Sequence, residues 1–164
     1  MTPSWIWFLP LSLIDDTAKE LKLDKNILAA MVMAESHGAP CAKAYENDYK
    51  WLFFPRENAK KCNITYEREL KDQKTSWGTL QVLGATAREL GYTGLLNDLC
   101  KDEKTAMRFG AMFLKKQLER YGNYHDAVAA YNAGSVRKKG EMYVNKKHVD
   151  KVFSFYRELT KIKE

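Results

Sequence analysis

DKNILAAMVMAESHG, residues 24–38, is the stretch of sequence from which the fold can be worked out. Asp24 is a residue type that caps the start of a helix, and Gly38 is one that follows the end of a helix. Apolar residues recur between them at helical spacing and predict one apolar face: Ile27, Leu28, Met31 and Val32.

Glu35 falls on the apolar face of this predicted helix, three residues after Val32 and four after Met31. An apolar environment disfavours the charged form of a carboxyl group. A carboxylic acid that is still protonated near neutral pH can act as a general acid. Most glutamates near helix ends are solvated instead, because a buried unpaired glutamate is rare. Glu35 is therefore a candidate catalytic acid whose role depends on the rest of the chain.

Length and composition predict a single folded domain over residues 1–164. This length suffices to bury a core, and a hydrophobic content of 45% argues against disorder. The net charge of +6 suits an anionic partner, either nucleic acid, anionic lipid or acidic cell-wall polymer. The basic residues are scattered, with only small clusters at 137–139 and 146–147. We interpret these clusters as solvated surface and expect no nucleic-acid partner.

The three cysteines leave several interpretations open, because an odd number cannot pair completely within one chain. We place free thiols first and a disulfide between Cys41 and Cys62 second. A metal site formed by His37, Cys41 and Cys62 comes third, since their spacing matches no zinc pattern. Cys100 has no assigned partner, and we expect no metal or other cofactor.

The N-terminal residues 1–10 are expected to form an arm, with residues 5–9 packed on the domain. Their apolar run is interrupted by Pro10 and is too short to span a bilayer. The segment has no basic start and no small-residue cleavage site, so we expect no signal peptide.

Most of the remaining chain follows helical patterns. We expect helices over residues 11–21, 85–90 and 95–100, a long one capped by Asp102, one from Asn123 to Gly134, and a last one over 141–159. Residues 39–75 break the pattern, which predicts an irregular or small β segment. We expect its aromatic residues Trp51, Phe53 and Phe54 to pack on the helical core.

Three further motifs follow Glu35-Ser36 in order along the chain. They are Ser76-Trp77-Gly78-Thr79-Leu80-Gln81, then Ala130-Tyr131-Asn132-Ala133-Gly134, then Tyr143-Val144. Each has an ordinary structural explanation when taken alone. Together, over residues 27–156, they resemble the catalytic domain of soluble lytic transglycosylases, which shares a lysozyme-like fold with goose-type lysozymes.

The sequence departs from the family pattern in three places. Thr79 and Leu80 stand where the family usually has Leu-Met, and Gly84 stands where it often has proline. The segment between Ser36 and Ser76 is also longer than in typical bacterial members, which bears on the shape of the substrate groove. The resemblance implies that residues 39–75 line that groove.

The resemblance implies cleavage of the β-1,4 bond between N-acetylmuramic acid and N-acetylglucosamine in peptidoglycan. Glu35 would protonate the glycosidic oxygen and then accept the proton of the muramoyl C6 hydroxyl. This internal attack gives a 1,6-anhydro product without water, so one carboxyl group suffices where most glycosidases use two.

The resemblance also implies roles for the other motif residues. Tyr143, on the last helix, would orient Glu35 through its hydroxyl. The sugars or their N-acetyl groups would form hydrogen bonds with Ser76, Gln81 and Asn132. Tyr131 would line the groove. The expected partner is the peptidoglycan glycan strand, and we expect a monomer acting on the bacterial cell wall.

Two other functions fit the same motifs. A lysozyme-type hydrolase would need a second carboxylate to position water, and the long segment offers Glu46, Asp48, Glu57, Glu67, Glu69 and Asp72. A catalytically dead module that contacts the cell wall in a phage or secretion machine is the other alternative. Intact Glu35 and Gln81 argue against it, whereas a phage lytic enzyme would fit a small basic catalytic domain.

Overall fold

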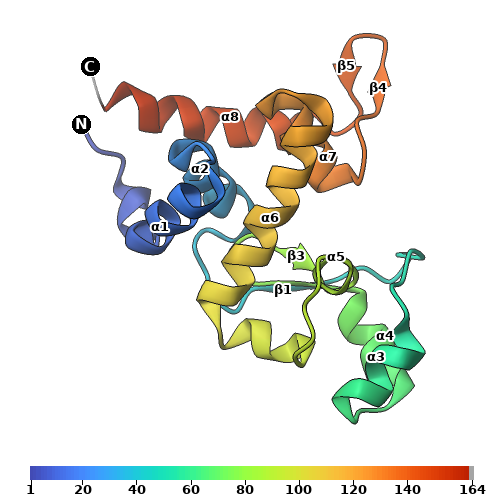
Figure 1. Cartoon of the computed structure of the whole chain (residues 1–164). Coiled ribbons are helices and arrows are strands. Elements are labelled where there is room, and N and C mark those ends of the chain that lie inside the picture. The colour runs from blue at the N-terminus through green and yellow to red at the C-terminus, as the bar shows by residue number, and fades with distance from the viewer. Residues whose placement is uncertain (163–164) are drawn as a thin grey trace. The chain divides into compact units, whose positions relative to one another are not determined.

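The chain folds into two units in the computed structural model, which describes residues 1–162 (Figure 1). The first unit contains Met1–Gly38 and the chain from Ala111 onward, and the second contains Ala39–Gly110. The fold is mainly helical, which confirms the predicted lysozyme-like helical class. Each unit is built around its own set of buried residues.

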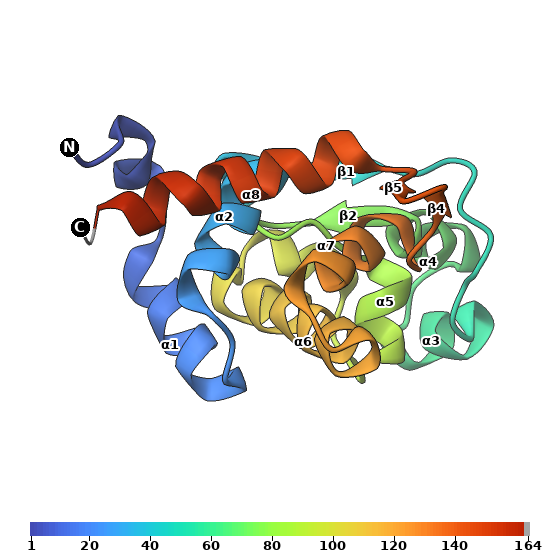
Figure 2. The ribbon, with the colours of Figure 1, turned by 90° about the horizontal axis from the view of Figure 1, so that it is seen from above.

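The first unit is built around α2 (Lys25–Ser36), which is buried on every side. The side chain of Asp24 caps it by accepting hydrogen bonds from the main-chain N–H groups of Asn26 and Ile27. The sequence predicted a single apolar face, but every residue from 27 to 34 is buried. Two helices make this possible by packing against α2 (Figure 2): α1 (Leu11–Leu21) and α8 (Lys146–Lys161).

The N-terminal arm begins with a short 3-10 helix, Ser4–Phe8. The indole ring of Trp5 packs edge-on against Phe155, and its N–H donates to Glu158 at 2.7 Å. Leu9 is buried as well, whereas Trp7 and Phe8 lie exposed to solvent. The arm therefore contacts α8 through Trp5 and does not pack on the domain along its whole length.

The last helix begins later than the sequence indicated. Its expected start at residue 141 is wrong, because β4 (Lys138–Lys139) and β5 (Met142–Tyr143) form an antiparallel hairpin there (Figure 1). Gly140 stands first in the two-residue turn with a φ of +64°. Turns of this kind need a positive φ, and glycine adopts it without strain.

The other predicted helices are present with small changes at their ends. They are α5 (Gly84–Glu89), the 3-10 helix Leu96–Cys100, α6 (Glu103–Tyr121) and α7 (Tyr124–Ala133). The predicted caps also form. The Asp102 carboxylate accepts a hydrogen bond from Thr105 N, and the Asn123 side chain accepts one from Asp126 N.

The second unit holds a small antiparallel sheet in the order β1-β2-β3. Its strands are β1 (Lys43–Tyr45), β2 (Thr75–Trp77) and β3 (Val82–Leu83). Between β1 and β2 the long segment also forms two helices, α3 (Pro55–Cys62) and α4 (Tyr66–Gln73). The buried cluster beneath this sheet consists of Trp77, Val82, Ala87, Leu96, Leu99 and Ala106.

The aromatic residues of the long segment do not anchor it by packing inward. Trp51 is 75% exposed and Phe54 is 61% exposed, so the expectation of a buried aromatic group is wrong. Gln73 holds this part of the chain instead. Its side-chain oxygen accepts from Phe53 N at 2.8 Å, and its nitrogen donates to Phe53 O at 2.9 Å.

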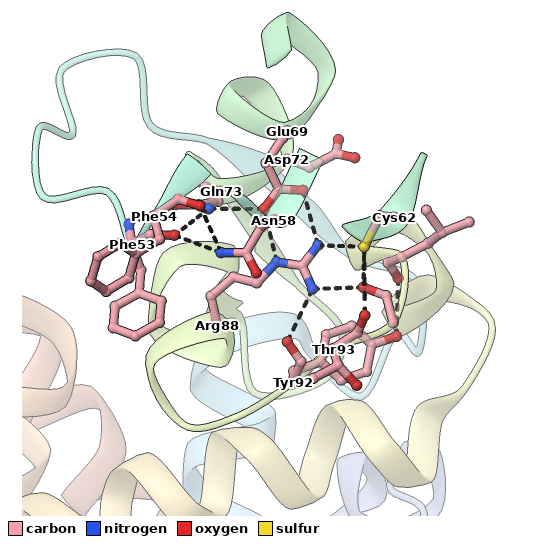
Figure 3. A network of polar contacts seen from close by, with 12 residues as sticks. Phe53, Phe54, Asn58, Cys62, Glu69, Asp72, Gln73, Arg88, Tyr92 and Thr93 are labelled. Atoms are coloured by element: carbon pink, nitrogen blue, oxygen red, sulfur yellow. Dashed lines mark hydrogen bonds and ion pairs between the residues drawn. The ribbon is translucent and has the colours of Figure 1, made fainter. Parts of the chain in front are cut away.

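A buried ion pair lies next to this clamp (Figure 3). The Arg88 guanidinium donates to both carboxylate oxygens of Glu69, at 2.8 and 2.9 Å, and the two side chains are almost completely buried. Arg88 also donates to the main-chain oxygens of Tyr92 and Gly94. Gln73 donates to Glu69 as well, so the ion pair joins α4, α5 and the loop before α3.

Gly84 has a packing reason. A Cβ atom at this position would lie 2.2 Å from the main-chain oxygen of Asp72. Any side chain there, proline included, would force α4 and α5 apart. The departure from the family pattern at Gly84 therefore follows from the close approach of these two helices.

The cysteines are not arranged as expected. Cys41 forms a disulfide with Cys100, and Cys62 is the free thiol, so both preferred interpretations of the sequence were wrong. Cys41 precedes β1, while Cys100 ends the 3-10 helix that packs beside β2. The fold of the second unit thus brings together two cysteines that are far apart in sequence.

The buried ion pair yields a stability prediction. Replacing Arg88 by Met leaves the Glu69 carboxylate buried without its cation, and breaking such a pair costs about 3–5 kcal/mol. We expect urea denaturation followed by tryptophan fluorescence to show a loss of this size. The double variant Glu69→Leu/Arg88→Met should be more stable than Arg88→Met alone, because it buries no unpaired charge. Equal stability of the two variants would contradict this.

Candidate active site

Glu35 lies in the last turn of α2, with 13% of its side chain exposed. The nearest titratable partner is His148 of α8, whose Nε2 atom lies 3.2 Å from Glu35 Oε1. His148 is also largely buried, with 17% of its side chain exposed. The two atoms are close enough for an ion pair, yet their present orientation does not form a hydrogen bond.

Two more groups of the first unit lie near the Glu35 carboxyl. Tyr131 is only 8% exposed. Burial raises the pKa of its hydroxyl well above the usual value, and the negative charge of Glu35 raises it further. Lys151 Nζ donates a hydrogen bond to the main-chain oxygen of Ala34 at 3.1 Å. A phenol and an imidazole therefore lie near the carboxyl, while Lys151 joins α8 to the main chain at the end of α2.

Tyr143 is not placed as the sequence indicated. It lies on β5 rather than on the last helix, and its hydroxyl donates to the carboxylate of Asp126. A hydroxyl has one hydrogen, so it cannot also donate to Glu35. The pKa of Tyr143 is raised to about 12 by burial first and then by Asp126. The expected orienting bond from Tyr143 to Glu35 is thus replaced by one to α7.

Asn132 lies near the end of α7 and is exposed. Its side-chain oxygen accepts a hydrogen bond from Asn145 at 2.9 Å, and Asn145 also donates to Ala129 O. These bonds fix the chain just before α8 against α7. Asn132 and Tyr131 thus come from the same helix, but only Asn132 presents its side chain to solvent.

Ser76 and Gln81 belong to the second unit and lie around one turn. Ser76 is on β2, paired with Ala44 of β1 and Leu83 of β3. Gln81 adopts a left-handed backbone conformation with a φ of +50°. Its side-chain nitrogen donates to Ala42 O at 2.9 Å and to Gly78 O at 3.0 Å. Because this nitrogen is committed to the main chain, only the amide oxygen of Gln81 is suited to meet a ligand.

His148 is not among the site residues predicted from the sequence. A signal for it was present, because His148-Val149 is an aromatic residue followed by valine in the first turn of the last helix. Tyr143-Val144, five residues earlier, matched the family motif by residue type but lies in the hairpin. The position expected of the motif tyrosine, beside Glu35 on the last helix, is occupied by His148.

The described part of the chain shows neither a metal site nor a membrane span. Within residues 1–162 no three His, Cys, Asp or Glu side chains are grouped so that they could hold a metal ion. No helix in this range is both long and apolar enough to cross a membrane.

The sequence model of the Transglycosylase SLT domain matches residues 12–153, which include Glu35, all the motifs and His148. The chain belongs to this family. No curated protein and no solved structure matches it. At the level of the family, the activity is that of a lytic transglycosylase, a lyase of glycosidic bonds in peptidoglycan.

The contact between Tyr143 and Asp126 yields a prediction for Tyr143→Phe. The hydrogen bond from Tyr143 is the largest cause that holds the Asp126 pKa below its usual value. We expect the Asp126 pKa, followed by NMR, to rise toward its usual value in the variant. A depressed carboxyl pKa stabilises the folded state above the unfolded pKa of about 3.9, and this stabilisation is lost as pH falls. The stability difference between the two proteins should therefore shrink on acidification.

Turnover separates this structural role from a catalytic one. Tyr143→Phe should keep a rate of the same order as the wild type, because the lost hydroxyl does not contact Glu35. A loss of about tenfold or more, which is the effect of removing a hydrogen bond to a catalytic carboxylate, would contradict the prediction.

Proposed function

We propose that this SLT-family domain cleaves the β-1,4 bond between N-acetylmuramic acid and N-acetylglucosamine and forms a 1,6-anhydromuramoyl end, with Glu35 as the single general acid and base. The observation that carries the proposal is the position of Glu35. It follows eight consecutive buried residues of α2 and keeps a small exposed fraction through which a substrate oxygen can approach.

The mechanism needs two proton transfers at one carboxyl group. Glu35 first donates its proton to the glycosidic oxygen as the bond to the muramoyl C1 breaks. The carboxylate then accepts the proton of the C6 hydroxyl as that oxygen attacks C1. The proton count balances within the sugar and Glu35, so water is not consumed. A buried position suits the first step, because it disfavours the charged form of a carboxyl group.

The remaining motif residues are proposed to bind the glycan. We assign substrate contacts to Ser76, Gln81 and Asn132, through the Gln81 amide oxygen in the second case. Tyr131 is buried near Glu35. Burial first, and then the negative charge of Glu35, raises the pKa of its hydroxyl. Residues 39–75, which lead into Ser76, are proposed to contact the same strand. The net charge of +6 would attract anionic wall polymer over long range, in a way that salt weakens.

The hydrolase alternative loses one of its candidates for a second carboxylate. Glu69 is fully buried and bound to Arg88, so it has no access to water or substrate. Asp72 is held beside Arg68, with its Oδ2 atom 3.7 Å from Arg68 Nε. Glu46, Asp48, Glu57 and Glu67 lie on the surface, as solvated side chains do. These observations support the mechanism with one carboxyl group.

Glu35→Gln tests the proposal directly, because the amide keeps the shape of the side chain and lacks the proton. General acid–base catalysis contributes on the order of 10²–10⁴-fold, so release of muropeptides from purified peptidoglycan should fall by at least about a hundredfold. Circular dichroism should show that the variant remains folded. Glu119→Gln, an exposed carboxyl on α6 outside the proposed binding residues, is the matched control and should keep the wild-type activity.

Mass spectrometry of the released muropeptides separates the lyase from the hydrolase. The proposed reaction gives 1,6-anhydro ends, whereas hydrolysis gives reducing ends that are heavier by one water. Reducing ends as the main product would rule out the intramolecular step, and wild-type lysis by Glu35→Gln would rule out this residue as the acid.

A further inference from the structure

We propose that His148 is the positioning residue for Glu35, and that the imidazole and the carboxyl share one proton and titrate as a pair. This inference rests on the proposed function of Glu35 and adds a residue that the motifs did not indicate. As a consequence, the dependence of turnover on pH is set by two coupled groups and not by the Glu35 carboxyl group alone.

The geometry around the pair supports this assignment. His148 Nε2 and Glu35 Oε1 are 3.2 Å apart, and neither atom has a hydrogen-bond partner among the described residues. Unsatisfied buried polar atoms are rare and costly. A small rotation of the ring or the carboxyl group would satisfy both atoms at once. His148 Nε2 and Glu35 Oε1 can satisfy each other only when a proton lies between them.

The helix that carries His148 is held firmly at this point. Val149 and Val152, on either side of the same turn, are buried in the first unit. Lys151 bonds to Ala34 O, so α8 is fixed to the last turn of α2 next to Glu35. The imidazole therefore reaches the carboxyl from an element that cannot slide along α2 without breaking these contacts.

The shared proton suits both steps of the reaction. With the proton on Glu35, neutral His148 accepts a hydrogen bond from the carboxylic acid and keeps it oriented until the glycosidic oxygen takes the proton. Once the glycosidic oxygen has taken this proton, the carboxylate accepts the proton of the C6 hydroxyl, which restores the shared proton to the pair. Unperturbed histidine changes its charge between about pH 5 and 8, whereas the hydroxyl of tyrosine does not. A coupled pair loses its protons in two steps that belong to the pair.

Other titratable groups of the first unit lie around the end of α2 and are relevant to the pH dependence of Glu35. Tyr131 on α7 has its pKa raised far above neutrality and keeps its proton in this range. The ammonium group of Lys151 on α8 donates a hydrogen bond to Ala34 O. The His148 variants leave both of these groups unchanged and therefore isolate the contribution of the pair.

Two substitutions at His148 separate positioning from titration. His148→Leu removes every polar contact, and the loss of one hydrogen bond to a charged group predicts a fall in turnover of roughly ten- to a hundredfold. His148→Gln can still hydrogen-bond the carboxyl but cannot bind a proton. We expect it to recover most of the turnover at its own pH optimum.

The pH profile of turnover on soluble peptidoglycan fragments is the deciding measurement. In the wild type the pair keeps one proton until its second deprotonation, which sets the midpoint of the alkaline limb. In His148→Gln the carboxyl loses its proton without a second base, so this midpoint should move to lower pH. The matched control is His125→Gln, which removes an imidazole that stacks on Phe153 and should leave the profile unchanged.

The outcomes distinguish this inference from the proposed function. If the midpoint of the alkaline limb in His148→Gln equals that of the wild type, the proposal that the pair shares a proton is wrong. Full turnover in His148→Leu overturns the positioning role, and if that variant does not fold, the glutamine variant still decides. An inactive wild type, or an active Glu35→Gln, overturns the proposed function itself and is recognised before any His148 variant is measured.

Discussion

The burial of α2 on every side is the constraint on which the candidate site depends. A helix with one apolar face can rotate slightly about its axis, but residues 27–34 are packed all round and leave no such freedom. The start of the helix is fixed as well. Asp24 N donates a hydrogen bond to the Tyr124 hydroxyl at 2.7 Å, while the Asp24 carboxylate caps the first turn. Glu35 therefore leaves the last turn in a direction set by the whole core of the first unit.

The second unit is organised by polar groups to an unusual degree for a buried region. Burying Glu69 and Arg88 costs desolvation free energy, which is offset only if the remaining hydrogen-bonding atoms also find partners. Gln73 and the main-chain oxygens of Tyr92 and Gly94 supply them (Figure 3). The loop through Phe53 is held by Gln73 through its main chain. This leaves Trp51 and Phe54 on the surface, where side chains are available to a ligand.

Local signals in the sequence predicted the helices and the position of Glu35 well. Caps such as Asp24, Asp102 and Asn123 act within one turn, so their effect can be inferred from residue type and spacing. The disulfide between Cys41 and Cys100 could not be inferred, because it depends on how a 3-10 helix packs beside β2. The exposed aromatic residues were missed for a similar reason, since composition does not reveal a polar anchor.

A correct prediction of the site from the sequence depends on the residue at which α8 begins. Tyr143-Val144 and His148-Val149 are five residues apart, and either can open a helix by pattern alone. The hairpin turn at Gly140 favours the later start, because it leaves residues 142–143 paired with β4. A pattern of side chains does not contain this information, which comes from backbone pairing between segments.

Tyr143 contributes to the site indirectly, because it binds Asp126 and does not contact the Glu35 carboxyl. Its hydroxyl binds Asp126 near the beginning of α7, while Asn145 binds Ala129 and Asn132 near the end of the same helix. These bonds fix the chain on α7 immediately before α8 begins. His148 follows Asn145 by three residues, less than one helical turn. The hairpin therefore determines where α8 starts, and the start of α8 determines that His148, and not Tyr143, lies beside Glu35.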